Sequence, residues 1–121
     1  MNLLAAILVA STSLNITVWP NGVGQPGKHA HTLRCAPVGG TLPNRGTACR
    51  HLAALKAPFA PTPPGTACIQ IYGGPQVALV TGRFRGHTVR AHFSRIDGCE
   101  IARWNRVRFL FPGAAGVTSS G

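Results

Sequence analysis

The chain has 121 residues, enough for one domain with a modest core, and carries 12 Lys and Arg against two acids, for a formal net charge of +10. A hydrolase with two catalytic carboxylates would need both acids, Asp97 and Glu100, in one site. The sequence contains no G-x-S-x-G motif and no glycine-rich phosphate-binding loop between a strand and a helix. We therefore expect that the protein is not an enzyme.

The excess positive charge favours anionic partners. However, the basic residues are scattered without an adjacent run, and no zinc-finger, helix-turn-helix or RNP-type signature accompanies them. We interpret the charge as a solvated basic surface and do not expect nucleic acid as a partner. Five arginines near the predicted strands fit a solvent-facing sheet surface: Arg83, Arg85, Arg90, Arg106 and Arg108.

Residues 1–13 begin with an apolar run, Leu3 to Ala10, followed by small residues. The run is too short to span a bilayer, which needs about 20 residues, so no stable membrane insertion is expected. It resembles the end of a signal peptide that lacks its positively charged start. The segment is either a truncated secretion signal or simply an apolar terminus. We favour the truncated signal, which predicts a secreted, extracellular protein.

The remaining patterns predict an α+β domain, a five-stranded antiparallel sheet with one or two short helices on one side, over residues 14–112. Alternation and β-branched residues predict strands at Leu14–Trp19, His31–Cys35, Val77–Thr81, Val89–Phe93 and Val107–Phe111. Arg83–His87 contains a Gly-centred hairpin turn, and in Val89–Ser94 the set Arg90, His92 and Ser94 should face solvent. Residues 113–121 are small and polar, and a flexible tail is expected there.

A helix is predicted over Asn44–Lys56, because Ala48, Leu52 and Leu55 share one face. Asn44 or Thr47 would cap its start, and Pro58 would end it. Cys99–Asn105 could form a further helical turn. Both tryptophans, Trp19 and Trp104, are expected in the core.

Four cysteines, Cys35, Cys49, Cys68 and Cys99, allow three pairings. None forms a C-x-x-C motif, so structural zinc is not expected, and the His29/His31 pair fits a polar loop better than a metal site. No cofactor or metal is predicted. Two disulfides in an exported protein fit better, and we favour Cys35–Cys49 with Cys68–Cys99, each stabilising by about 3 kcal/mol in the chain-entropy model.

The segment Pro61–Pro75 is too rich in proline and glycine for a helix or a central strand. Its middle, Cys68 to Tyr72, has strand-like residues anchored by a cysteine. We predict an exposed, extended loop that is stiffened by prolines. Such a loop suits the cleft of a protease, where it would imitate a substrate.

Several short motifs occur in a characteristic order: Thr32-Leu33-Arg34-Cys35-Ala36-Pro37, Gly46-Thr47-Ala48-Cys49, Leu52-Ala53-Ala54-Leu55, Cys68-Ile69-Gln70-Ile71-Tyr72 and Asp97-Gly98-Cys99-Glu100. In this arrangement the chain resembles the Streptomyces subtilisin inhibitor family of secreted serine-protease inhibitors, over roughly residues 14–111. The resemblance implies a five-stranded antiparallel sheet with two short helices, disulfides Cys35–Cys49 and Cys68–Cys99, and a homodimer formed through the sheet.

The resemblance also implies a site. The reactive bond maps onto Gln70–Ile71, with Gln70 as the residue that enters the specificity pocket of a subtilisin-like protease. The protease-contact loop is completed by Ala67, Cys68, Ile69, Tyr72 and Gly73, and Asp97 matches a position that supports the loop.

Four residues depart from the family pattern. Gln70 stands where Met, Lys or Arg is common, so strong trypsin inhibition is not expected. Gly73 and Gly74 should loosen the loop just past the bond. Asp97 replaces an Asn and can accept but not donate hydrogen bonds.

Two functions from different classes follow. The first is a secreted inhibitor of subtilisin-like proteases that acts through Gln70–Ile71. The second is a basic extracellular module that binds anionic polymers or nucleic acid and has lost inhibition. Steeply salt-dependent binding would mark the second function.

Overall fold

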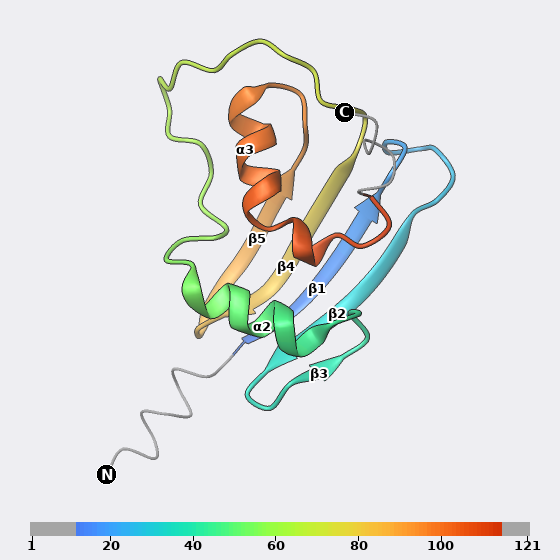
Figure 1. Ribbon diagram of the computed structural model, residues 1–121, viewed down its shortest axis with the longest axis vertical. Helices are drawn as coiled ribbons and strands as arrows, with labels where there is room; N and C mark the ends of the chain where they lie inside the picture. The colour runs from blue at the N-terminus through green and yellow to red at the C-terminus, as the bar shows by residue number, and fades with distance from the viewer. Residues whose placement is uncertain (1–11, 115–121) are drawn as a thin grey trace.

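Strand β1 (Thr12–Trp19) lies at the centre of a five-stranded antiparallel sheet with the order β3-β2-β1-β4-β5. The computed structural model describes residues 12–114, and helices α2 and α3 lie on one face of the sheet (Figure 1). The other elements are β2 (His29–Cys35), β3 (Gly39–Gly40), α2 (Arg45–Ala54), β4 (Val77–Phe84), β5 (His87–Phe93), α3 (Gly98–Arg106) and the 3-10 helix η1 (Arg108–Leu110). The predicted fold class is confirmed.

The alternating pattern of β1 determines which face is buried. Leu14, Ile16 and Val18 point toward the helices and are almost fully buried, whereas Ser13 and Asn15 are exposed on the opposite face. Register follows from this alternation, because a slip of one residue would turn the apolar set to solvent.

The β4–β5 hairpin closes through a two-residue turn. Phe84 pairs with His87, and both residues between them have positive φ, 52° at Arg85 and 82° at Gly86. Two left-handed residues in succession match the right-handed twist of the flanking strands. The predicted Gly-centred turn is therefore confirmed.

The predicted last strand, Val107–Phe111, is wrong. Val107 ends α3, and the chain then forms η1 rather than an extended segment. The buried residues Val107, Leu110 and Phe111 are spaced three and four apart, as in a helical turn, while Phe109 is only half-buried. Arg106 and Arg108 consequently belong to α3 and η1 and not to the sheet.

The fifth strand is instead β3, a pair of glycines that was missed. Leu33 pairs with Gly40 and Arg34 with Gly39. A Cβ on Gly40 would lie 2.3 Å from the Thr32 carbonyl oxygen, so only glycine permits this approach.

Helix α2 ends two residues earlier than predicted, at Ala54. Its N-cap residue, Asn44, is left-handed with φ 57°, and its side chain makes no capping hydrogen bond. Leu55 already adopts an extended conformation, so the helix ends before Ala57, the residue whose conformation Pro58 restricts. Ala48 and Leu52 are buried as predicted, and the confirmed Cys35–Cys49 disulfide, with Cα atoms 5.7 Å apart, joins the helix to β2.

An aromatic cluster fills the space between sheet and helices. The ring of Phe111 lies 5.4 Å from Phe93 and 4.6 Å from Trp104, whose exposed fraction is only 3%. Trp19, by contrast, is half-buried on the outer face, with the Lys28 amine 5.5 Å from its ring centroid. Trp104 is therefore a core residue as predicted, and Trp19 is not. Ser94, predicted on the wet face, is also buried.

The packed region extends slightly past the predicted limits of residues 14–112. Thr12 and Ser13 belong to β1, and Ala114 is buried. Most of the predicted leader and tail lies outside the described residues. Within residues 12–114, no helix is long and apolar enough to cross a membrane.

Arg85 joins the hairpin to the end of α2. Its Nη2 atom donates to the carbonyl oxygens of Leu52 at 3.1 Å and Ala53 at 3.3 Å in the last turn of α2, where the Leu52 carbonyl also accepts from the Leu55 N–H. Its guanidinium carbon also lies 4.4 Å from the centroid of the Phe84 ring. The turn therefore supplies a cation to the C-terminal end of a helix.

We predict that Arg85→Asn lowers the free energy of unfolding by about 1–2 kcal/mol, because the helix loses charge-assisted hydrogen bonds while Asn still tolerates a positive φ. Urea denaturation measures the change. Arg90→Asn, at an exposed position of β5, is the control and should change stability by less than about 0.5 kcal/mol. Equal losses in the two variants would contradict the role of Arg85.

Candidate functional site: an exposed loop fastened to helix α3

The segment Pro61–Pro75 contains no helix or strand and passes around α3, as Figure 1 shows. Its most exposed large side chains are Ile69 at 72%, Tyr72 at 70% and Ile71 at 51%. Gln70 is exposed between them. The loop predicted from composition is therefore present. Of the predicted contact residues, Ala67, Ile69 and Tyr72 are exposed, whereas Cys68 and Gly73 are only partly exposed.

The upstream half of the loop is shaped by a tight turn. Pro63-Pro64-Gly65-Thr66 has a Pro at the second position and Gly65 with φ 81° at the third, as a type II turn requires. The Thr66 hydroxyl donates to the Pro63 carbonyl at 2.6 Å. Two rigid prolines and a side-chain bond fix the approach to Cys68.

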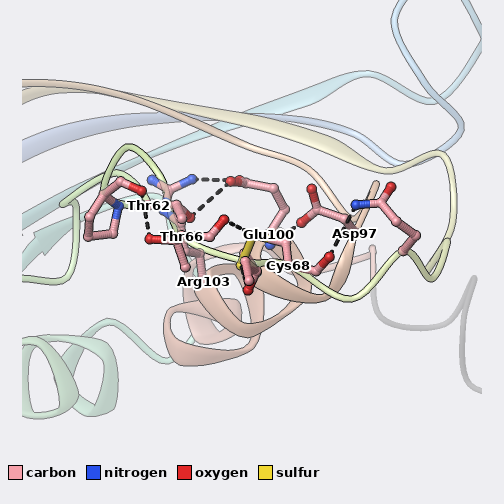
Figure 2. The surroundings of a disulfide bond; sticks show 10 residues. Thr62, Thr66, Cys68, Asp97, Glu100 and Arg103 are labelled. Atoms are coloured by element: carbon pink, nitrogen blue, oxygen red, sulfur yellow. Dashed lines mark hydrogen bonds and ion pairs between the residues drawn. A yellow bond between two sulfur atoms is a disulfide. The ribbon is translucent and has the colours of Figure 1, made fainter.

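An ion pair on α3 secures the entry to the loop. Arg103 Nη1 contacts Glu100 Oε1 at 2.8 Å, and the Thr62 hydroxyl donates to Glu100 Oε2 at 3.2 Å (Figure 2). Arg103 Nε also donates to the Ala60 carbonyl at 3.0 Å. Because Arg103 is buried, its charge depends on these partners. Sequence analysis missed this pair, although Glu100 and Arg103 stand three residues apart on a predicted helical turn.

The Cys68–Cys99 disulfide joins the centre of the loop to the first turn of α3. Its Cα atoms are 5.3 Å apart, and the bridge closes a segment of 31 residues. This is the pairing that we favoured. Asp97 lies within 4.8 Å of both sulfur atoms, but sulfur atoms held in a disulfide are not thiolate ligands, so this group is not a metal site.

Main-chain hydrogen bonds hold the loop on both sides of the Gln70–Ile71 bond. On the upstream side, the Gly98 N–H donates to the Ile69 carbonyl at 2.8 Å. On the downstream side, the Gly73 N–H donates to the Arg95 carbonyl at 2.7 Å, and Arg95 Nε donates back to the Gly73 carbonyl at 3.2 Å. The two attachments leave Gln70, Ile71 and Tyr72 exposed between them.

Gly73 serves close packing rather than flexibility. A Cβ at this position would lie 2.8 Å from Ile101 Cδ1 and 3.2 Å from Arg95 Cβ. Gly98 makes a comparable approach, since its Cβ would lie 3.3 Å from both Ile69 Cβ and the Ile69 carbonyl oxygen. The loosening that we expected from Gly73 is offset by two hydrogen bonds at that residue.

Gln70, the predicted specificity residue, folds back on its own loop. Its Nε2 donates to the Cys68 carbonyl at 3.1 Å, and the Ile71 N–H donates to the Ile69 carbonyl at 3.0 Å. Entry of the Gln70 side chain into a pocket therefore requires that the first of these bonds break. Because Gln70 is exposed, the exchange with water is inexpensive.

Asp97 is placed beneath the loop, at the N-terminus of α3. Its Oδ1 accepts a hydrogen bond from the Glu100 N–H at 2.9 Å, the geometry of a helix N-cap. Among the described contacts its carboxylate bonds to the helix and not to the loop. It therefore acts on the loop through α3, whose first turn carries Gly98 and Cys99.

We predict that Gly73→Ala lowers the free energy of unfolding by about 1–3 kcal/mol, because the added methyl displaces Ile101 or breaks the contact with Arg95. Thermal or urea denaturation measures the loss. The matched control is Gly46→Ala in α2, where the nearest atom to a Cβ is an Arg50 nitrogen at 3.7 Å. That control should be neutral or stabilising by up to about 1 kcal/mol. A neutral Gly73→Ala would contradict the packing argument.

The fold has relatives among known proteins. The model of the subtilisin inhibitor-like family matches residues 10–95, more than half of the chain. Among solved structures, a similar fold occurs in the crystal structure of Streptomyces caespitosus sermetstatin in complex with Bacillus licheniformis subtilisin, with 24% identity and a TM-score of 0.51 over 83% of this chain and 96% of that chain. No curated protein sequence matches significantly. The chain belongs to the subtilisin inhibitor-like family.

Proposed function

We propose that this protein is a secreted inhibitor of subtilisin-like serine proteases and that Gln70–Ile71 is its reactive bond. The observation that carries the proposal is the attachment of the loop main chain at Ile69 and Gly73, on either side of an exposed Gln70. Family membership supports the inhibitory class, and the sermetstatin of similar fold is in complex with a subtilisin.

The mechanism follows from substrate-like binding. Residues Ala67 to Gly73 enter the cleft as an extended segment, and their main chain pairs with a strand of the protease. Gln70 occupies the specificity pocket of the protease. A broad apolar pocket accommodates its side chain, whereas the acidic pocket of a trypsin-like enzyme gains no ion pair from it. Since the loop is already ordered, little conformational entropy is lost on binding.

Cleavage of the Gln70–Ile71 bond does not release either half of the loop. The new carboxyl side stays attached through Ile69 and the Cys68–Cys99 disulfide, and the new amine side stays attached through Gly73. The amine therefore remains close to the acyl-enzyme, and re-formation of the peptide bond competes with hydrolysis. The inhibitor itself contributes no catalytic group.

Two further properties complete the proposal. The two disulfides suit an oxidising, extracellular location, which agrees with the apolar segment near Met1. The sheet face opposite the helices carries an apolar strip of Trp19, Val77, Leu79 and Ala30 on three adjacent strands, which suits a homodimer interface. The alternative, a basic module without inhibitory activity, is not favoured by family or loop geometry.

We predict that the purified protein inhibits subtilisin and that Gln70→Pro raises the inhibition constant at least about 30-fold, which corresponds to about 2 kcal/mol. Proline removes a main-chain donor at the centre of the loop. Inhibition of subtilisin with a chromogenic peptide substrate measures the effect. Gln70→Lys should add inhibition of trypsin, because Lys can pair with its acidic pocket.

The fold of each Gln70 variant is checked by circular dichroism and thermal denaturation, and it should match that of the unchanged protein because the position is exposed. Absence of inhibition at micromolar protein against subtilisin-like and chymotrypsin-like proteases would refute the proposed function.

For the homodimer, we predict that Leu79→Arg shifts the protein to monomer in sedimentation velocity, because it places a charge within the apolar strip. Thr88→Arg, at an exposed position near the β4–β5 hairpin, is the control and should leave the dimer intact. If the unchanged protein sediments as a monomer at about 100 μM, a concentration well above a micromolar dissociation constant, the proposed dimer is refuted.

A further inference from the structure

A groove is lined by residues of α2 on one side and of the end of α3 with η1 on the other. Figure 1 shows that these helices lie on the same face of the sheet. Its volume is about 1670 Å³, larger than a typical small-ligand pocket of about 300–1,000 Å³. One end is formed by Tyr72 to Pro75, just downstream of the Gln70–Ile71 bond. The groove therefore has the size for an extended peptide segment of several residues.

Five basic side chains line the groove: Arg50, His51, Arg95, Arg106 and Arg108. Asp97 and Glu100, which are the only acids of the whole chain, do not line it. Asp97 caps α3, and Glu100 pairs with Arg103. The groove therefore collects positive charge that neither Asp97 nor Glu100 neutralises there.

Two of these arginines lie close enough to affect each other. Burial, and secondarily the charge of Arg108, lower the pKa of the Arg95 guanidinium below its ordinary value. The side-chain partners of Arg95 are neutral oxygens, the Gly73 carbonyl and Asn105 Oδ1 at 3.1 Å. A bound anion would relieve the repulsion between these like charges.

The first turn of α2 adds to this field. It contains no acidic residue, and Asn44, which lines the groove, makes no side-chain capping bond. The partial positive charge of a helix N-terminus therefore acts in the same direction as the arginines.

The walls favour a peptide over a nucleic acid. Trp104 and Phe111 line the groove but are buried, with exposed fractions of 3% and 2%. Phe109 is half-buried and packs edge to face against His51, with ring centroids 5.0 Å apart. Tyr72, which also lines the groove, is the one Tyr, Trp or Phe ring among these residues that is largely exposed, at 70%. A run of nucleic-acid bases would therefore find a single stacking face, whereas the methylene groups of acidic side chains can pack on these partly apolar walls.

We propose that the groove between α2 and α3 is a second binding site, which takes an acidic peptide segment in extended conformation and pairs its carboxylates with Arg50, Arg106 and Arg108. Arg106 and Arg108 are exposed, and within residues 12–114 neither side chain makes a hydrogen bond, so both guanidiniums can form bidentate pairs with carboxylates. This site differs from the sheet-face arginines and does not require inhibition of a protease.

Calorimetry with acetylated hexaglutamate at about 20 mM salt tests the proposal. The double variant Arg106→Gln/Arg108→Gln should weaken binding about 5- to 30-fold, because it removes two of the proposed guanidinium–carboxylate pairs. The matched control, Arg34→Gln/Arg90→Gln, removes the same charge from exposed positions on the outer sheet face. It should change the affinity less than about twofold. Amide shifts in NMR spectra should cluster on α2, η1 and Tyr72–Pro75.

Three outcomes would overturn the proposal. The first is that hexaglutamate does not bind. The second is that both double variants lose affinity equally, because that result would indicate a response to net charge alone. The third is that a single-stranded hexanucleotide binds the groove more tightly than hexaglutamate does. Because none of these measurements uses a protease, their result is independent of whether the unchanged protein inhibits subtilisin.

Discussion

The contact between the loop and the first turn of α3 is the constraint on which the site depends. The Cys68–Cys99 disulfide and the hydrogen bond from Gly98 to Ile69 act at adjacent residues of both segments. The helix is in turn held on the sheet by Trp104 and its aromatic neighbours. A long loop without secondary structure would otherwise lose much entropy on binding, so its order has to come from this attachment.

The scarcity of acids explains how the rest of the charge is arranged. Both carboxylates of the chain lie within four residues, Asp97 to Glu100, and both act at α3. Asp97 caps the helix, and Glu100 ties Thr62 and the buried Arg103 together. Since Asp97 and Glu100 both act where the loop is attached to α3, neither pairs with the basic side chains of the α2–α3 groove, and positive charge gathers beside the loop.

The sequence predicts the fold class, four of the five strands, both disulfides and the exposed loop, because each of these has a local signature. β1 alternates strictly, and the Arg85-Gly86 turn has a glycine between two apolar runs. The pair Gly39–Gly40 has no side-chain pattern, so β3 could not be recognised. Val107 to Phe111 fits both an alternating strand and a helical turn, and only packing against Phe93 and Trp104 decides between them.

The attachments of the loop at Ile69 and Gly73 were not predictable, because they join residues 22 or more positions apart through main-chain atoms. They have a consequence for how such a protein can diversify. Apart from the disulfide, the loop centre is fastened by its backbone, while the side chains of Ile69, Gln70, Ile71 and Tyr72 contribute little to the packed core. The sequence of the exposed tetrapeptide can therefore change independently of the scaffold. A library of variants at these four positions could be selected for binding without any change to the core.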